Sequence, residues 1–354
     1  MKKAEIIDIF ITVIDNYGDM GFACEFISAI EREYGEQYEC VVWTDDAMAM
    51  REFVSRSGLG EVAIGDIAEF WILRKSVIGI SILHAPIPDM DFFAPRALIL
   101  RIDYLSLDTS WISQNGTEHI TSTRDRQIIE LIPSVLEGGA GLIAPVSLSS
   151  RMQQSEADWS KVMKVPGHGL LHSKGISNAS QRDTTSQWPV QQKHITIFTY
   201  PSTIDRIDWD SFPSDLIVYV YSSSDTLTFQ HPHIRVFHFL PTHEYYTLLD
   251  TSEFAIIRWE VSWAHMIQGS VPFLWDMYQG IGGWPSEQSE QFLEFIWASP
   301  DYRWVHKILS GQKQWKITYA DILWALSHTR FVPRRTHNLI HTVKKHIDRF
   351  QNSI

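Results

Sequence analysis

Asp15 and Asp19 stand four residues apart in the stretch TVIDNYGDMGFACEF (12–26). The stretch follows an apolar run, breaks on glycine and leads into a helical pattern, so both aspartates fall in a turn between a predicted strand and a predicted helix. In many nucleotide-binding folds this turn binds phosphate through free backbone N–H groups. Carboxylates would repel a phosphate, which indicates that they face a cation or a group that must lose a proton.

A purely structural role for these aspartates is the alternative. Asp19 can cap the following helix, because an aspartate side chain accepts hydrogen bonds from the first free N–H groups of a helix. Asp15 can stabilise the turn through its own backbone. The spacing of the two residues is compatible with both interpretations.

The elements that position the aspartates follow from hydrophobic periodicity. Apolar or β-branched runs alternate with helical patterns along the first half of the chain. A strand followed by a helix, repeated, is typical of a parallel sheet with helices on both faces. Strands are predicted at 6–14, 40–46, 77–83 and 97–103, and helices at 21–35 and 47–58.

The alternation resumes after residues 172–193, a segment rich in Ser, Thr, Asn and Gln that predicts a linker or long surface loop. We therefore predict two Rossmann-like doubly wound α/β domains, residues 1–175 and 190–354, facing each other across a cleft. Ligands of such sheets bind beyond the carboxyl ends of the strands. The second half has predicted strands at 194–200, 216–223, 234–241, 254–259 and 271–275, and predicted helices at 244–250 and 262–269.

Composition excludes some classes of function. The 354 residues include 42 Asp and Glu against 30 Lys and Arg, a balance that argues against general nucleic-acid binding. Cys24 and Cys40 show neither a pairing pattern nor metal-ligand spacing, which suits a reducing compartment. We find neither a cleavable signal peptide nor an apolar run of membrane length. We expect a cytoplasmic protein that binds neither nucleic acid nor membranes.

Four segments resemble the bacterial arginine rhamnosyltransferases that modify elongation factor P. VIDNYGDMG (13–21) is similar to the family's DNFGDIG turn, WTDDAMAM (43–50) to its WTDD segment, and IDYLSLD (102–108) to its EYLSAE segment. The segment FLPTHEYYTLLDTSEFAIIRWEVSWAHMIQGSVPFLWDMY (239–278) follows, without a gap, the family's run from FLPQ through RGEDS to FFWHIY. These matches keep their order and span both halves of the chain.

The resemblance implies a GT-B fold and an inverting glycosyltransferase that needs neither a metal nor a cofactor. The family transfers L-rhamnose from dTDP-β-L-rhamnose to an arginine of translation elongation factor P. By this resemblance the N-terminal domain presents the acceptor surface and the C-terminal domain binds the donor nucleotide. Asp19 matches the general base that takes a proton from the acceptor guanidinium, and Asp15 would orient that cation by charge-assisted hydrogen bonds.

The donor-site candidates also follow from the resemblance. Glu260 would bind sugar or ribose hydroxyls, while Ser262 and Arg258 would hold the diphosphate beside the helix that begins nearby. Phe239 and Tyr200 would stack on the nucleobase, because any aromatic face suits a base. Alternatively, Glu260 and Ser262 only cap the helix, and each aromatic residue belongs to the core. The remaining donor-site candidates are Thr242 and Tyr278.

Several positions depart from the family pattern. The RGEDS run reads RWEVS (258–262), so Trp259 replaces a glycine and Val261 an aspartate in the donor site. Thr242 stands where the family has the glutamine expected to read the base, and Asp276 stands where it has a histidine. Two alternatives follow: a related glycosyltransferase with a different sugar nucleotide or acceptor, and a nucleotide-sugar-binding or protein-binding pseudoenzyme whose donor pocket is blocked by Trp259.

The segment THNLIHTVKKHIDRF (336–350) predicts an amphipathic helix. In two-domain transferases of this architecture the last helix often crosses back to the first domain. By that fold-level analogy we expect residues 336–352 to pack on the N-terminal domain.

Overall fold

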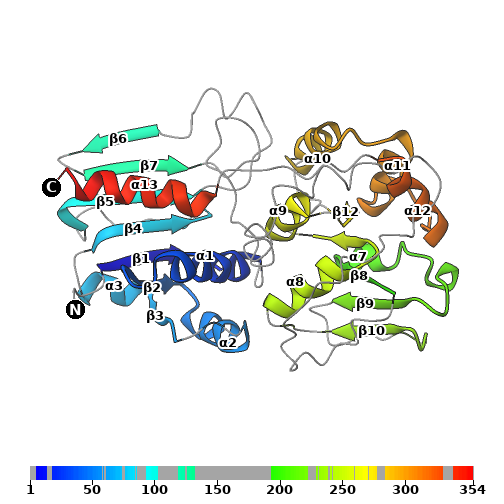
Figure 1. The fold of residues 1–354 in the computed structure, drawn as a ribbon, viewed down its shortest axis with the longest axis horizontal. Helices are drawn as coiled ribbons and strands as arrows, with labels where there is room; N and C mark the ends of the chain where they lie inside the picture. Colours follow the sequence, from blue (N-terminus) through cyan, green and yellow to red (C-terminus); the bar gives the residue numbers. More distant parts are fainter. Residues whose placement is uncertain are drawn as a thin grey trace, which may run out of the picture. The chain divides into compact units, whose positions relative to one another are not determined.

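A computed structural model of the chain describes residues 5–353, apart from 14–17, 58, 60, 74–75, 84, 86–92, 103–118, 124–125, 132–192, 222–228, 230, 238–239, 241, 259, 270, 277–283 and 330–337. The chain divides into two compact units. The N-terminal unit comprises Met1–Ala144 together with Arg334–Ile354, and the C-terminal unit comprises Pro145–Pro333. Each unit is built on its own sheet (Figure 1).

The N-terminal unit has a seven-stranded sheet in the order β3-β2-β1-β4-β5-β7-β6. Neighbouring strands are parallel except β6 and β7, which are antiparallel. The strands are β1 (Glu5–Ile11), β2 (Tyr38–Thr44), β3 (Ala63–Asp66), β4 (Ser76–Ile82), β5 (Phe93–Ile102), β6 (His119–Thr123) and β7 (Arg126–Leu131). The helices are α1 (Gly18–Tyr34), α2 (Ala47–Ser57), α3 (Ile67–Leu73) and α13 (Leu339–Gln351).

Strand β1 lies inside this sheet, between β2 and β4, and its residues 7–11 are all buried. Burial on both faces is typical of parallel strands that have helices above and below. The one carboxylate in this run, Asp8, accepts a hydrogen bond from Trp43 Nε1 at 2.8 Å. This hydrogen bond offsets part of the cost of removing the Asp8 carboxylate from water.

The last helix, α13, belongs to the N-terminal unit. Its first turn is tied to the end of α1, because Asn338 Nδ2 donates to Glu33 Oε1 at 2.9 Å and His341 pairs with Glu33 at 2.7 Å. Its apolar face is fully buried, as expected for an amphipathic helix on a sheet. The buried residues are Leu339, Ile340, Val343, His346, Ile347 and Phe350.

The C-terminal unit has a five-stranded, fully parallel sheet in the order β10-β9-β8-β11-β12. Its strands are β8 (His194–Phe198), β9 (Ile217–Tyr221), β10 (Ile234–Phe237), β11 (Ala255–Ile257) and β12 (Phe273–Trp275). Its helices are α7 (Pro201–Ile204), the 3-10 turn η2 (Trp209–Ser211), α8 (Thr242–Thr251), α9 (Glu260–Gln268), α10 (Trp284–Phe295), α11 (Pro300–Leu309) and α12 (Tyr319–Ser327).

Both sheets confirm the predicted α/β class with two doubly wound Rossmann-like units. The boundaries differ in detail. Helix α1 begins at Gly18 instead of residue 21, so Asp19 lies inside its first turn. Strand β10 ends at Phe237, well before the predicted 241. Helices α10, α11 and α12 had no counterpart among the predicted elements.

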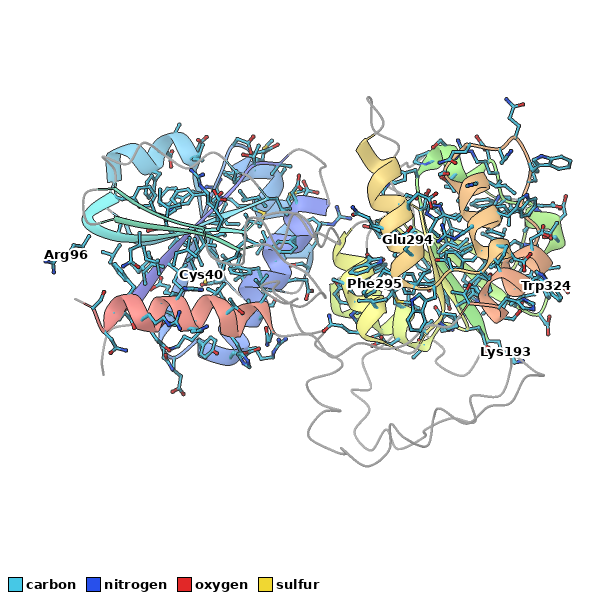
Figure 2. All side chains as sticks on the ribbon, turned by 90° about the horizontal axis from the view of Figure 1, so that it is seen from above. Cys40, Arg96, Lys193, Glu294, Phe295 and Trp324 are labelled. Carbon is cyan, nitrogen blue, oxygen red and sulfur yellow. The ribbon has the colours of Figure 1, made fainter. Side chains whose placement is uncertain are left out.

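Side chains fill the layers between sheets and helices in both units (Figure 2). Cys40 is buried on β2, and Cys24 is buried on α1. At the end of α10, the Phe295 ring lies 6.0 Å from that of Trp263, whereas Trp324 on α12 projects outward with 59% of its surface exposed. Within the described part of the chain, no helix combines the length and the apolar character that crossing a membrane requires.

Candidate functional site

The acidic turn of the N-terminal unit follows β1 at the topological switch point, because β1 has β2 on one side and β4 on the other. Asp19 occupies the first turn of α1 and is 6% exposed. A carboxylate there interacts favourably with the helix dipole. Any group that contacts the Asp19 carboxylate must therefore enter a buried position. Asp15 lies outside the described residues.

The WTDD segment helps to shape this turn. Asp45, directly after β2, accepts a hydrogen bond from the backbone N–H of Val13 through Oδ1 at 2.9 Å. Asp46 caps α2, since its Oδ1 accepts from Ala49 N at 2.9 Å. Asp45 thus fixes the backbone just ahead of the acidic turn, a role that sequence reasoning had not assigned.

In the C-terminal unit, polar and aromatic residues follow three neighbouring strands. Thr199 and Tyr200 come after β8, Arg258 after β11 and Asp276 after β12. Because the strands are parallel, these residues share one edge of the sheet, which we call the carboxyl edge. The chain switches sides of the sheet between β8 and β11, which is where ligands bind in folds of this kind.

Arg258 lies between two aromatic rings at the carboxyl edge. Its guanidinium carbon is 4.6 Å from the ring centroid of Phe198 and 4.6 Å from that of Tyr200. Phe198 and Tyr200 are two residues apart in extended backbone, so their side chains lie on the same side and both reach the guanidinium. The Arg258 side chain is buried, and the π-faces stabilise its charge.

Asp276, which follows β12, is bonded to residues at the ends of β8 and β11. Its Oδ2 accepts hydrogen bonds from Thr199 Oγ1 and, at 3.0 Å, from Tyr200 N. Its own N–H donates to Ile257 O at 2.7 Å. Burial raises the pKa of Asp276 to about 6, although the hydrogen bonds from Thr199 and Tyr200 act in the opposite direction.

A hydrogen bond joins α8 and α9 next to this edge. The hydroxyls of Tyr245 and Ser262 are 2.8 Å apart, and Ser262 lies in the first turn of α9. The Tyr245 ring also packs edge-on against Phe198, with ring centroids 5.6 Å apart. Burial raises the pKa of the Tyr245 hydroxyl, so it stays protonated and able to donate.

The structure thus brings three of the predicted donor-site residues into one contact network. Tyr200 contacts Arg258, Arg258 contacts Phe198, and Phe198 reaches Ser262 through Tyr245. Two expectations change. The Tyr200 ring contacts the Arg258 guanidinium, and the Ser262 hydroxyl already has a partner in Tyr245.

Other predicted residues are placed only by their backbone, or lie outside the described part of the chain. Glu260 is the first residue of α9 and Thr242 the first of α8, so both stand where a helix leaves the carboxyl edge. Phe239 and Tyr278 fall outside the described residues, as does Trp259.

Sequence reasoning missed Thr199 and Tyr245, and noted Asp276 only as a substitution. The signal for Thr199 was present in the alternation Phe198, Thr199, Tyr200, which places the threonine on the opposite side from both rings. The bond from Thr199 to Asp276 spans 77 residues and has no local signature.

No protein-family model and no curated protein matches the chain. Solved structures do show similarity. A structure on EarP-mediated arginine glycosylation of translation elongation factor EF-P aligns over 99% of both chains at 15% identity, with a TM-score of 0.47. The glycosyltransferase SnogD from Streptomyces nogalater aligns over 87% of this chain and 90% of its own at 10% identity, with a TM-score of 0.46. A UDP complex of S. aureus MnaA aligns over 90% and 94% at 12% identity, with a TM-score of 0.38.

Proposed function

We propose that the chain is an inverting glycosyltransferase that binds a nucleotide-sugar donor at the carboxyl edge of its C-terminal unit and modifies an arginine side chain. The observation that carries the proposal is the placement of Arg258. A guanidinium held between Phe198 and Tyr200 at a switch point supplies fixed positive charge where such folds bind ligands. The sequence resemblance in 239–278 supports the same assignment.

A departing nucleoside diphosphate needs positive charge and hydrogen-bond donors. Arg258 supplies the charge, and the N–H groups at the start of α9, which begins at Glu260, supply donors. Ser262 would contribute its hydroxyl from the same turn, held in place by Tyr245. The Tyr200 ring would stack on the nucleobase, because any aromatic face suits a base. With this charge provided by the protein, the donor site requires no metal ion and no cofactor.

On the acceptor side, Asp19 is proposed as the general base. A guanidinium is protonated at any working pH, and it becomes a nucleophile only when a nitrogen gives up a proton. The nitrogen lone pair attacks the anomeric carbon, the bond from that carbon to the diphosphate oxygen breaks, and the diphosphate leaves with the electron pair. The Asp19 carboxylate takes the proton from the attacking nitrogen. Asp15 would orient the cation.

The finer assignment is that the donor is dTDP-β-L-rhamnose and the acceptor an arginine of translation elongation factor P, which places the reaction in the cytoplasm. It rests on the resemblance of segments 13–21 and 239–278. The test is to incubate the protein with dTDP-β-L-rhamnose and the elongation factor P of the same cell, and to measure the intact mass of the factor. One added deoxyhexose on one arginine is expected, and an unchanged mass contradicts the assignment.

The substitution of Thr242 for a base-reading glutamine favours a second candidate, a transferase of the same chemistry with another nucleotide sugar. Thr242 begins α8, next to the carboxyl edge, and a threonine side chain offers fewer base-edge contacts than a glutamine. Calorimetry with dTDP and with UDP separates the candidates. Preference for dTDP supports the first, equal or stronger binding of UDP supports the second, and binding of neither contradicts both and supports the pseudoenzyme.

A further inference from the structure

The end of β8 presents side chains to two different partners. Phe198 and Tyr200 lie on one side of the extended backbone and hold Arg258 between their rings. Thr199 lies on the opposite side, and its hydroxyl donates to Asp276. The same three residues therefore connect the Arg258 guanidinium, on one side of the strand, to the buried Asp276 carboxylate, on the other side.

Asp276 reaches across a strand to make this connection. It follows β12, whereas Thr199 and Tyr200 follow β8, and β11 lies between these two strands in the sheet. The carboxylate binds the backbone N–H of Tyr200, and the N–H of Asp276 binds Ile257 O, directly before Arg258. One residue thus holds both the backbone that carries the ring and the backbone that carries the guanidinium.

We propose that Asp276 is a positioning residue of the donor site, which fixes the Tyr200 ring and the Arg258 guanidinium against each other so that they bind an anionic nucleoside diphosphate. The inference rests on the proposed function. Asp276 acts through these two residues, because its Oδ2 is already bonded to the end of β8. The family resemblance does not suggest this role, because the family has a histidine at this position.

Hydrogen bonding, more than charge, accounts for the positioning. Thr199 Oγ1 and Tyr200 N bind the same oxygen, Oδ2 of Asp276, and Thr203 provides a further side-chain hydrogen bond to this carboxylate. An asparagine can place its amide oxygen there and accept both bonds, with the NH₂ group in the place of Oδ1. An alanine accepts neither and leaves the buried N–H of Tyr200 without its acceptor. The asparagine and alanine variants therefore separate the loss of charge from the loss of the bonds.

The chain offers a matched control in Asp321. Its Oδ2 also accepts from a threonine hydroxyl and a backbone N–H, those of Thr318, at 2.7 and 2.9 Å. This pair forms the capping box of α12, whose first residue, Tyr319, packs against Phe254 immediately before β11. Helix α12 therefore begins near the amino ends of the strands, and Figure 1 shows it at the other end of the unit from the carboxyl edge.

The test compares wild type, Asp276→Asn, Asp276→Ala and Asp321→Ala in the full-length protein. Calorimetry measures dTDP affinity, and hydrogen exchange measures the peptide that contains the Tyr200 amide. We expect Asp276→Ala to weaken dTDP binding about tenfold and to accelerate exchange of that peptide, as loss of a buried acceptor predicts. Asp276→Asn should recover affinity to within about threefold, as a conservative rescue. Asp321→Ala should lose stability while keeping its dTDP affinity.

Three outcomes overturn the inference: unchanged affinity in Asp276→Ala, affinity as weak in Asp276→Asn as in Asp276→Ala, or an equal loss in Asp321→Ala. If Asp276→Ala does not fold, Thr199→Val removes one bond from the other partner, with Thr199→Ser as its conservative counterpart. If wild type binds neither dTDP nor UDP, the proposed function fails, and the donor role of Asp276 fails with it. If wild type binds and Asp276→Ala binds equally well, only the inference fails.

Discussion

The guanidinium carbon of Arg258 lies 4.6 Å from the ring centroid of Tyr200, at the carboxyl ends of two neighbouring strands. Taking a guanidinium out of water costs several kcal/mol unless other groups compensate. Stacking on the rings of Phe198 and Tyr200 offsets part of this cost, by roughly 2 kcal/mol for a desolvated cation–π contact. The positive charge is thus held in a fixed place before any ligand binds, which favours recognition of an anion.

Two replacements of Arg258 should weaken nucleotide binding to different extents. Arg258→Lys keeps the charge but loses the planar group that stacks on both rings, so we expect a moderate loss of dTDP affinity. Arg258→Met removes the charge and should cost about 10- to 100-fold, the usual worth of hydrogen bonds to a charged group. Calorimetry with dTDP checks both variants.

Arg303→Met is the control for these variants, because Arg303 pairs with Glu290 at 2.7 Å on the surface of the same unit. It should leave dTDP affinity unchanged, since surface ion pairs contribute little. An Arg258→Met protein that binds dTDP as tightly as wild type would exclude Arg258 from the donor site.

Replacing Asp19 should slow transfer strongly while the fold persists. In Asp19→Asn the amide cannot take a proton from the acceptor guanidinium, and we expect the transfer rate to fall on the order of 10²-fold or more. The rate is measured by mass spectrometry of the acceptor, and circular dichroism reports on the fold. Asp66→Asn is the control variant for an aspartate replaced elsewhere in the same unit, because Asp66 accepts a hydrogen bond from Ala68 N at the start of α3. Transfer at the wild-type rate in Asp19→Asn would remove Asp19 from the mechanism.

The bond between Tyr245 and Ser262 should show energetic coupling. Tyr245→Phe keeps the ring against Phe198 and removes the hydroxyl 2.8 Å from Ser262, so each of Tyr245→Phe and Ser262→Ala should cost about 1 kcal/mol of stability. Because both variants remove the same bond, the double variant should cost less than the sum of the two. Denaturant unfolding of the four proteins in the cycle measures this difference, and additive losses would show that the bond contributes nothing.

Much of the fold can be predicted from the sequence, but few contacts of the candidate site can. Strands such as β8 and β9 are buried on both faces, so they appear as unbroken β-branched and aromatic runs that are visible locally. Helices α11 and α12 were missed, although their start signals are present: Ser299 before Pro300, and Thr318 three residues before Asp321. The buried positions of α11 also recur at helical spacing, at Tyr302, Val305, His306 and Leu309, so both the capping residues and the periodicity of this helix are present in the sequence.

The candidate site was harder to predict for a physical reason. Arg258 and Ser262 were found through a motif, but the partners that hold them, Tyr245 and Asp276, lie on other elements of the unit. Such contacts depend on strand order, which places β11 between β8 and β12. Local periodicity reports which face of an element is buried and does not report which element lies next to it.

Asp276 should make stability depend on pH in a definite direction. Its pKa is raised from an ordinary 3.8 to about 6 by burial, so the folded protein binds this proton more tightly than the unfolded chain does. Stability therefore falls as the pH rises from about 4 to about 6, by about 3 kcal/mol, and stays at the lower level above that range. Asp276→Asn cannot titrate and should lack this slope.

The measurement is the free energy of unfolding of wild type and Asp276→Asn between pH 4 and pH 7. The difference between the two curves is needed because His306, whose pKa burial lowers from 6.5 to about 4, contributes a slope of the opposite sign. The His306 contribution is present in both proteins, so it cancels in the difference between their free energies of unfolding. Parallel curves would mean that Asp276 titrates alike in the folded and unfolded chains.

The last helix should stabilise the N-terminal unit, although it follows the C-terminal unit in sequence. Ile347 on α13 is 1% exposed, and truncating such a residue leaves a cavity, so Ile347→Ala should cost roughly 2–5 kcal/mol. Lys345→Ala, at an exposed position of the same helix, should change stability by less than about 0.5 kcal/mol. Hydrogen exchange locates the effect: because Glu33 on α1 binds Asn338 and His341, peptides of α1 should lose protection in Ile347→Ala. Loss of protection in β8 and β11 instead would assign the helix to the C-terminal unit, and the division of the chain at residue 334 would be wrong.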